Sequence, residues 1–160
     1  MTNASDALIK QEILDKFENI NNFKLRIFPS SSNQDQKLFK NGGLTFVSEG
    51  IAYGSCDAAL INNNITIAIE GSDCLNRRSS GSAQYQRFHH ALGAVRNGHI
   101  GIYYLRKGDH AIRGDLYGMA VNASKVEKGF YLITQDLNQI LDLVNNFEDE
   151  NKKNIIISNW

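Results

Sequence analysis

Proline occurs once in this chain of 160 residues and cysteine twice, and no apolar run approaches the roughly 18 residues that a membrane-spanning helix needs. The two cysteines, Cys56 and Cys74, are too few for a disulfide framework, and neither has a second Cys or a His at zinc-ligand spacing. The N-terminal stretch is charged and amphipathic, which is not the pattern of a secretion signal. We therefore expect a cytoplasmic protein with no membrane partner.

The composition, with 42% hydrophobic and 21% charged residues, is typical of one globular domain. We predict that residues 1–147 form this domain and that residues 148–160 are a polar linker and tail.

The net charge of zero conceals an uneven distribution of charge along the chain. Residues 71–130 contain nine Lys and Arg against four Asp and Glu, whereas residues 1–70 contain six against eight. All four histidines lie in the basic segment. A basic centre favours binding of a polyanion, although a helix with solvated arginines would give the same count.

Hydrophobic periodicity predicts helices that alternate with strands, which indicates an α/β fold with a sheet covered on both faces. Helices are predicted over residues 5–17, 82–96, 116–123 and 137–144, and strands over 23–28, 44–48, 55–61, 65–70, 100–105 and 130–134. Residues 71–81 lack periodicity, and we predict a mobile loop there that ends at Ser82 as a helix N-cap. Asp136 is the predicted cap of the last helix.

The clearest local feature is a β-hairpin around Asn63-Asn64, which tolerate the positive φ of a two-residue turn. With this turn, Asp57 lies opposite Glu70. Opposed side chains share a face, with β-carbons roughly 5 Å apart, so two carboxylates confront each other. The other face of the hairpin is apolar and is expected to pack on a helix.

Asp57 and Glu70 therefore predict a metal site, since Mg²⁺ is commonly held by one or two carboxylates with waters and phosphate oxygens. Such a cation polarises a phosphate and lowers the pKa of a bound water. Two alternatives stay open: a turn shifted by one residue would place the acids on opposite faces, and acids at a fraying strand end would hold no ligand.

These residues resemble the PD-(D/E)XK nuclease superfamily, to which many type II restriction endonucleases belong. The resemblance covers about residues 5–105 and rests on the order helix, three strands, helix, strand. Asp57 stands in Cys-Asp-Ala-Ala-Leu-Ile and Glu70 in Ile-Glu-Gly-Ser. The resemblance implies a restriction-endonuclease-like αβββαβ core with a mixed central sheet, and hydrolysis of DNA with Mg²⁺, for which Mn²⁺ would substitute.

The chain departs from the superfamily at Ser72, where the family usually has Lys two residues after the acid. Serine cannot supply that charge, so the resemblance directs the search to the following helix. Gln84, expected on the face of that helix aimed at the sheet, could bind the attacking water or orient Glu70. It could equally be a structural amide bonded to backbone. Arg87 could neutralise the scissile phosphate.

Other residues are weaker candidates for the same site. The resemblance makes Glu12, at the margin of the apolar stripe of the first helix, a third metal ligand, although a solvated position fits it as well. Arg77 and Arg78 either clamp phosphates or are solvated. Neighbouring residues of a helix point about 100° apart, so at most one of His89 and His90 reaches the site. We assign His89 to a nucleic-acid contact.

The leading hypothesis is a Mg²⁺-dependent DNA endonuclease of the restriction type. A homodimer is expected, because one site cuts one strand and two-fold DNA favours a two-fold enzyme. The missing Lys supports an alternative from another class, the same fold without chemistry as a module that binds nucleic acid or protein. A small α/β domain that binds a metabolite is a third possibility, for which no phosphate loop or dinucleotide fingerprint is present.

Overall fold

A computed structural model describes residues 2–28, 45–48, 51–62, 65–78 and 80–148. Its helices are α1 (Thr2–Phe17), α3 (Ser80–Ala83), α4 (Phe88–Arg96), α5 (Gly114–Val126) and α6 (Leu137–Asn145), with a 3₁₀ helix η1 (Cys74–Asn76). Its strands are β1 (Lys24–Ile27), β2 (Thr45–Ser48), β3 (Ile51–Ser55), β4 (Ala58–Asn62), β5 (Ile65–Ser72), β6 (Ile100–Leu105) and β7 (Phe130–Thr134). The predicted tail lies almost entirely outside the described residues. No helix of the described part is long and apolar enough to cross a bilayer.

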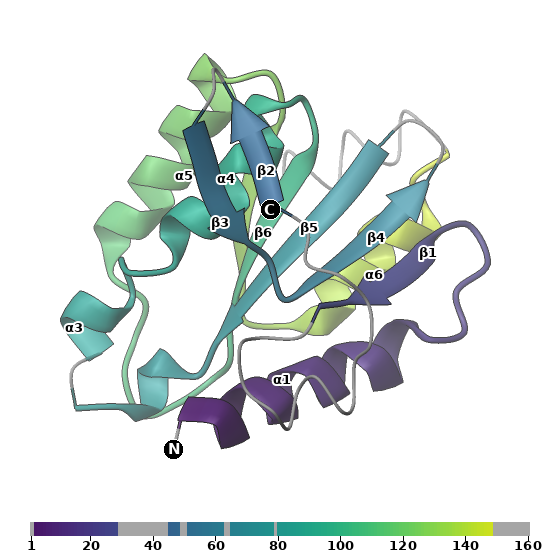
Figure 1. Cartoon of the computed structure of the whole chain (residues 1–160). Helices are drawn as coiled ribbons and strands as arrows, with labels where there is room; N and C mark the ends of the chain where they lie inside the picture. Colours follow the sequence, from purple (N-terminus) through teal and green to yellow (C-terminus); the bar gives the residue numbers. More distant parts are fainter. Residues whose placement is uncertain (1, 29–44, 49–50, 63–64, 79, 149–160) are drawn as a thin grey trace.

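Five strands form a mixed central sheet in the order β1-β4-β5-β6-β7 (Figure 1). The pairs β1–β4 and β4–β5 are antiparallel, whereas β5–β6 and β6–β7 are parallel and are connected by α4 and α5. The predicted pairing of β4 with β5 is confirmed from Asn62 opposite Ile65 to Ala58 opposite Ile69. The regular ladder ends there. Asp57 lies in a bend just before β4, and its N–H donates to the carbonyl of Ile69 at 3.1 Å.

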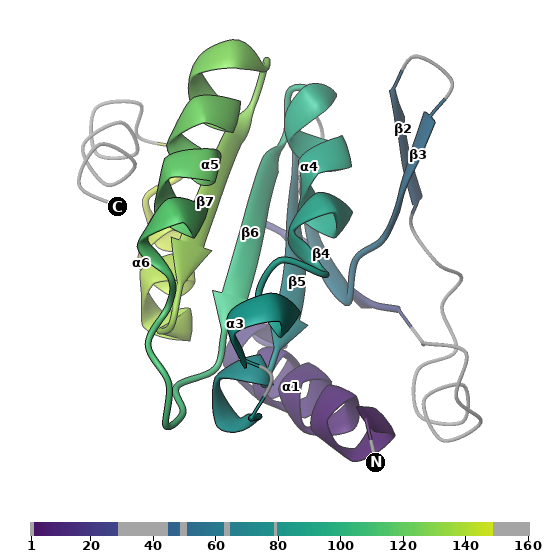
Figure 2. The same ribbon diagram turned by 90° about the vertical axis from the view of Figure 1, so that its left-hand side faces the viewer.

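Helices cover both faces of this sheet, as expected (Figure 2). On one face α1 and α6 pack on the apolar side of the hairpin, in a cluster that includes Ile9, Phe17, Leu60 and Ile69. On the other face α4 and α5 pack on Tyr103 and the neighbouring strands. Alternation along each strand sorts the side chains between these layers. Glu70, one residue after Ile69, therefore lies on the α4 face.

The contact between α4 and β6 depends on a glycine. A β-carbon on Gly101 would lie 2.4 Å from the carbonyl oxygen of Ala91 in α4. Only glycine lets backbone approach backbone this closely, so α4 can pack directly on β6 next to β5. This places the start of α4 within reach of Glu70.

Most predicted elements are confirmed within one to three residues, namely α1, β1, β4, β5, β6, α5, β7 and α6. The cap of α6 is confirmed as well, because the Asp136 side chain accepts a hydrogen bond from the N–H of Asn138 at 2.9 Å. The turn residues Asn63 and Asn64, and the loop predicted from Pro29, lie outside the described residues.

The prediction for residues 44–61 is wrong in one respect. The chain contains an additional strand, β3, which pairs with β2 in a separate two-stranded sheet, and the central sheet includes neither strand. Period-two alternation identified the strand at 44–48 but not its partner β3, which follows directly along the chain, with Ser48 opposite Ile51. Ala52 and Gly54 are poor strand formers, so β-propensity gave no signal for β3.

The prediction for residues 71–88 is also wrong. Gly71 and Ser72 continue β5, and η1 buries Cys74 and Leu75, so this segment is anchored in the core. Ser82 lies inside the short helix α3 instead of capping a long one. The chain then leaves helical geometry before α4 begins at Phe88. Gln84 therefore sits at a break between two helices.

Candidate functional site

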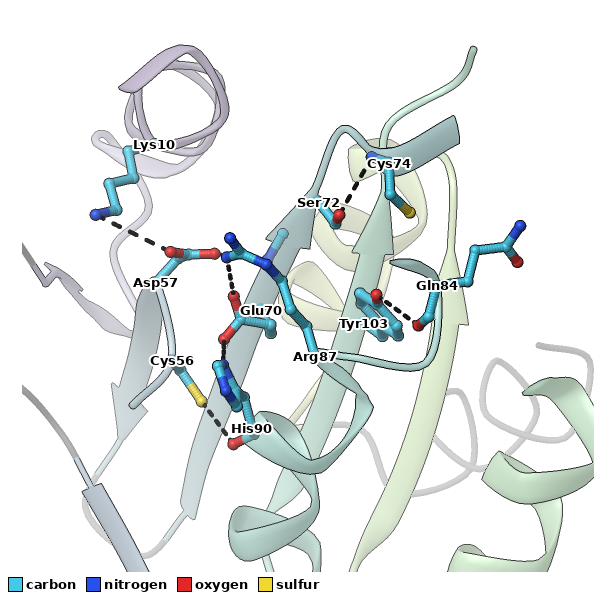
Figure 3. A network of polar contacts seen from close by, with 11 residues as sticks. Lys10, Cys56, Asp57, Glu70, Ser72, Cys74, Gln84, Arg87, His90 and Tyr103 are labelled. Atoms are coloured by element: carbon cyan, nitrogen blue, oxygen red, sulfur yellow. Dashed lines mark hydrogen bonds and ion pairs between the residues drawn. The ribbon is translucent and has the colours of Figure 1, made fainter. Parts of the chain in front are cut away.

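Glu70 is the centre of a polar cluster near the C-terminal end of β5 (Figure 3). Its side chain is 1% exposed. Oε2 lies 2.8 Å from Nδ1 of His90, and Oε1 lies 3.5 Å from Nη1 of Arg87. Both partners come from the start of α4, where Arg87 is the residue before the first helical position. A buried carboxylate requires such partners, since an unpaired buried charge is strongly unfavourable.

Asp57 lies beside Glu70 and faces the opposite helix layer. Its Oδ2 accepts a hydrogen bond from the N–H of Gly71 at 2.8 Å, and its Oδ1 lies 4.0 Å from Nζ of Lys10 in α1. A β-carbon on Gly71 would lie 2.4 Å from Cγ2 of Ile9. Because residue 71 is glycine, Ile9 of α1 and the Asp57 carboxylate can both pack directly against the backbone of β5.

Burial raises the pKa of the Asp57 carboxyl well above its usual range, and the charge and hydrogen bonding of Glu70 raise this pKa further. The Gly71 N–H and the Lys10 ammonium lower it. The two acids therefore repel each other, as expected of neighbouring carboxylates. The predicted register is wrong at this pair, because the ladder ends at Ala58 and Ile69, and Asp57 does not share the α4 face of Glu70. Two basic side chains, Lys10 and Arg87, offset this repulsion from opposite sides of the sheet.

His90 contributes a third basic group to the cluster. Burial lowers the pKa of its imidazole, and the charge of Arg87 lowers this pKa further, so the ring is predominantly neutral at pH 7. With its proton on Nδ1, the ring donates to an ionised Glu70 and leaves Nε2 as an acceptor. The Sγ of Cys56 donates to the His90 carbonyl at 3.3 Å.

Ser72 is close to this cluster, but its hydroxyl bonds to the neighbouring backbone and not to the acids. Its side chain is buried, and its Oγ accepts a hydrogen bond from the N–H of Cys74 at 3.2 Å. This bond fixes the start of η1 where β5 ends. Ser72 thus provides no charge to the two acids.

Gln84 is a structural amide and points away from Asp57 and Glu70 (Figure 3). Its Nε2 donates to Oγ of Ser80 at 3.0 Å and to the carbonyl of Ala111 at 3.1 Å. Its Oε1 accepts from the N–H of Arg113 at 2.8 Å. The prediction that Gln84 is aimed at the acids assumed a continuous helix, and the break after α3 turns the side chain toward the β6–α5 connection instead.

We expect Gln84→Leu to lower the free energy of unfolding by about 1–3 kcal/mol, because it removes the hydrogen bonds that a buried amide makes to Ser80, Ala111 and Arg113. Urea denaturation measures this loss. Gln86→Leu, at an exposed position two residues away, is the matched control and should change stability by less than about 0.5 kcal/mol. Equal midpoints for the two variants would contradict the assignment of Gln84 as a structural amide.

Glu12 does not join the two acids. Its carboxylate accepts hydrogen bonds from the hydroxyl of Tyr104 at 2.9 Å and from Nε of Arg106 at 2.8 Å. Arg106 also lies 3.6 Å from Asp73. Glu12 thus belongs to a separate surface cluster. Within the described ranges, no three His, Cys, Asp or Glu side chains gather closely enough to hold a metal ion.

The three residues predicted to contact nucleic acid, Arg77, Arg78 and His89, lie between β5 and the first turns of α4. Arg77 and Arg78 directly follow η1 and make no ion pair with a described residue; Arg78 is exposed. His89 is exposed, and its ring lies 4.4 Å from that of His90, centroid to centroid. Of the two histidines, His90 is the one that reaches the acids.

Two tyrosines hold the segment that carries Arg87. Because the chain is not helical between α3 and α4, its carbonyls need donors from elsewhere. The hydroxyl of Tyr103 donates to the carbonyl of Gln84 at 2.8 Å, and that of Tyr131 donates to the carbonyl of Phe88 at 2.7 Å. The buried tyrosines therefore fix the backbone on both sides of Arg87.

Lys10 is the residue of the cluster that sequence reasoning missed. At 100° per residue, position 10 falls between Phe17 and Leu14 on the helical wheel, inside the apolar stripe of α1. A lysine in such a stripe is a signal for a buried partner. Its exposure in the structure is 1%.

Asp57, in the bend before β4, and Glu70, in β5, form a pair of carboxylate donors of the type that a hard divalent cation takes together with water and phosphate oxygens. Comparison of the chain with protein-family models, with curated proteins and with solved structures gives no match. The function of the chain is therefore inferred from this cluster.

Proposed function

We propose that this protein is a metal-dependent nuclease that hydrolyses phosphodiester bonds in DNA, with Asp57 and Glu70 as the ligands of Mg²⁺. The observation that carries this proposal is the meeting of two mutually repelling, largely buried carboxylates between two basic side chains, Lys10 and Arg87. A fold gains nothing in stability from paired buried acids, and such groups are typical of functional sites.

The order of elements supports the same proposal. The helix α1, the strands β1, β4 and β5, the helix α4 and the strand β6 follow one another as in the PD-(D/E)XK resemblance, apart from the β2–β3 hairpin. Asp57 precedes the second of these strands, and Glu70 lies in the third. A restriction-endonuclease-like core is thus the proposed assignment of this fold.

In this proposal each residue of the cluster has a definite task. The cation, when bound, would polarise the scissile phosphate and lower the pKa of an attacking water. His90 orients the Glu70 carboxylate through Nδ1. Lys10 supplies the positive charge that Ser72 cannot supply, and Arg87, 28% exposed, can leave Glu70 to contact a phosphate oxygen. Arg77, Arg78 and His89 would bind the flanking backbone.

One observation favours the alternative of a non-catalytic binding module. Each of the four carboxylate oxygens already has a partner in the protein: Gly71 and Lys10 for Asp57, and Arg87 and His90 for Glu70. A purely structural network would have the same contacts and no affinity for a cation.

Titration with Mn²⁺ separates these two functions. We expect the full chain to bind one Mn²⁺ per protein, detected by loss of the free-ion electron paramagnetic resonance signal, and Asp57→Ala to weaken binding by at least about tenfold. Asp109→Ala, at an exposed loop position, is the matched control and should bind as the wild type does. Absence of Mn²⁺ binding by the wild type at millimolar concentration would favour the non-catalytic module.

A further inference from the structure

The connection between β6 and α5, residues 106–113, is bound to η1 through its backbone. The N–H of His110 donates to the carbonyl of Leu75 at 3.0 Å. The side-chain amide of Asn76 donates to the carbonyl of Lys107 at 3.4 Å. The connection is therefore held in a defined position beside the segment that follows β5.

A glycine allows the connection to lie directly on η1. A β-carbon on Gly108 would lie 2.6 Å from Oδ1 of Asn76 and 2.7 Å from the carbonyl carbon of Leu75. Only glycine permits so close an approach of backbone to its neighbours. The Gln84 amide, which bonds to this connection farther along, adds a second attachment. The two segments thus form one surface with a fixed shape.

Basic side chains are in excess on this surface. Residues 73–78 and 106–115 contain five Lys and Arg against three Asp. Two of the three acids are engaged, because Asp73 lies 3.6 Å from Arg106 and Asp115 accepts the Tyr85 hydroxyl at 2.6 Å. Four basic side chains make no ion pair with a described residue, and we call them the basic platform: Arg77, Arg78, Lys107 and His110.

The basic platform lies at the same edge of the sheet as the acidic pair. The parallel strands β5 and β6 end together there, and the N–H of Arg106 donates to the carbonyl of Ser72 at 3.0 Å. Glu70 is two residues earlier in β5, about 7 Å away at the rise of a strand. Each strand of a DNA duplex carries one phosphate per roughly 3.4 Å of helix axis. A strand whose scissile phosphate lies at the acids can therefore reach the platform within a few nucleotides.

We propose that the basic platform binds the phosphate backbone of DNA beside the scissile bond, with Lys107 and His110 as contacts in addition to the two arginines. This inference rests on the proposed function, because it identifies how the DNA substrate is held. Phosphate oxygens accept hydrogen bonds from all three of these basic residue types, and the release of counterions supplies affinity. Such contacts carry no base information, so the platform fixes the position of the duplex and not its sequence.

Fluorescence anisotropy of a short labelled duplex with the full chain in EDTA measures binding without cleavage. Lys107→Ala is expected to weaken binding about three- to tenfold and to reduce the slope of log K against log salt by about 0.9, the value for one lost phosphate contact. Lys128→Ala is the matched control, since this exposed lysine precedes β7 at the opposite edge of the sheet. It should bind as the wild type does. Equal salt slopes for Lys107→Ala and the wild type would overturn the proposal.

A substitution that leaves all charges in place tests the geometry of the platform. Gly108→Ala introduces a methyl group where Asn76 and Leu75 lie, so the connection must move away from η1. DNA affinity should fall at least about fivefold for this reason. Gly114→Ala, whose β-carbon would meet nothing within 4 Å, should bind as the wild type does. Thermal unfolding shows that each variant is folded, and unchanged affinity in Gly108→Ala would contradict a joint surface.

Asp57→Asn separates this inference from the proposed function. The variant should bind the duplex in EDTA at least as tightly as the wild type, because it removes no positive charge, yet it should not cleave. Binding that depends on Lys107 in a wild type that cuts no DNA would support the platform and contradict the nuclease. Cleavage by a wild type that binds no DNA in EDTA would overturn the platform alone.

Discussion

Asp57→Asn is expected to stabilise the metal-free protein and to abolish cleavage of DNA. Burial and Glu70 raise the pKa of Asp57, so the folded state binds this proton more tightly than the unfolded chain. Stability from this group is present at low pH and is lost as pH rises above the usual aspartate range, about 3.9. Asparagine cannot ionise and removes this penalty at pH 7.

Thermal unfolding in EDTA measures the first effect. We expect the midpoint of Asp57→Asn to lie about 2–4 °C above that of the wild type at pH 7, the shift of roughly 1 kcal/mol in a chain of this size. The difference should shrink at pH 5. Addition of Mn²⁺ should raise the midpoint of the wild type only. A variant that is less stable than the wild type at pH 7 would show that the ionised carboxylate stabilises the fold.

Lys10→Met is expected to change metal affinity and cleavage in opposite directions. At 4 Å and an effective dielectric constant near 20, two unit charges interact by about 4 kcal/mol. Removal of the ammonium, 4.0 Å from Asp57, therefore favours binding of a cation to the two acids. The same change removes the positive charge proposed to act on the phosphate, and the rate should fall roughly 10- to 100-fold.

The control for this prediction lies on the same helix. Lys16 binds Oδ1 of Asn138 at 2.7 Å and has no contact with the acids in the described structure, so Lys16→Met should leave affinity and rate unchanged. Mn²⁺ titration and single-turnover cleavage provide the two readouts. A parallel loss of affinity and rate in Lys10→Met would indicate that Lys10 only maintains the structure.

Local patterns in the sequence predicted the hairpin that brings the acids together. The register of β4 and β5 follows from a two-residue turn, and the apolar face with Leu60 and Ile69 packs on α1 as expected. The position of Asp57 outside the ladder could not be foreseen, because its contacts with Lys10 in α1 and with the N–H of Phe28 join residues that are distant in sequence.

The groups that surround the acids were harder to predict. The break between α3 and α4 depends on buried tyrosines of β6 and β7, which are distant in sequence. Because of this break, the Gln84 side chain points away from the acids, and Arg87 and His90 contact Glu70. Lys10 could have been found from the apolar stripe of α1, where a charged residue is out of place. The partner of Lys10 could not have been found in this way, because the sequence of α1 does not indicate that the partner is Asp57.

Cleavage of supercoiled plasmid DNA with Mg²⁺ tests the catalytic role of the acidic pair most directly. The wild type is expected to convert the plasmid to nicked or linear forms, and Asp57→Asn and Glu70→Gln should each reduce the rate at least about 100-fold, with Asp109→Ala unaffected. Equal cleavage by the wild type and both acid variants, or none by any of them, would contradict a nuclease site at Asp57 and Glu70.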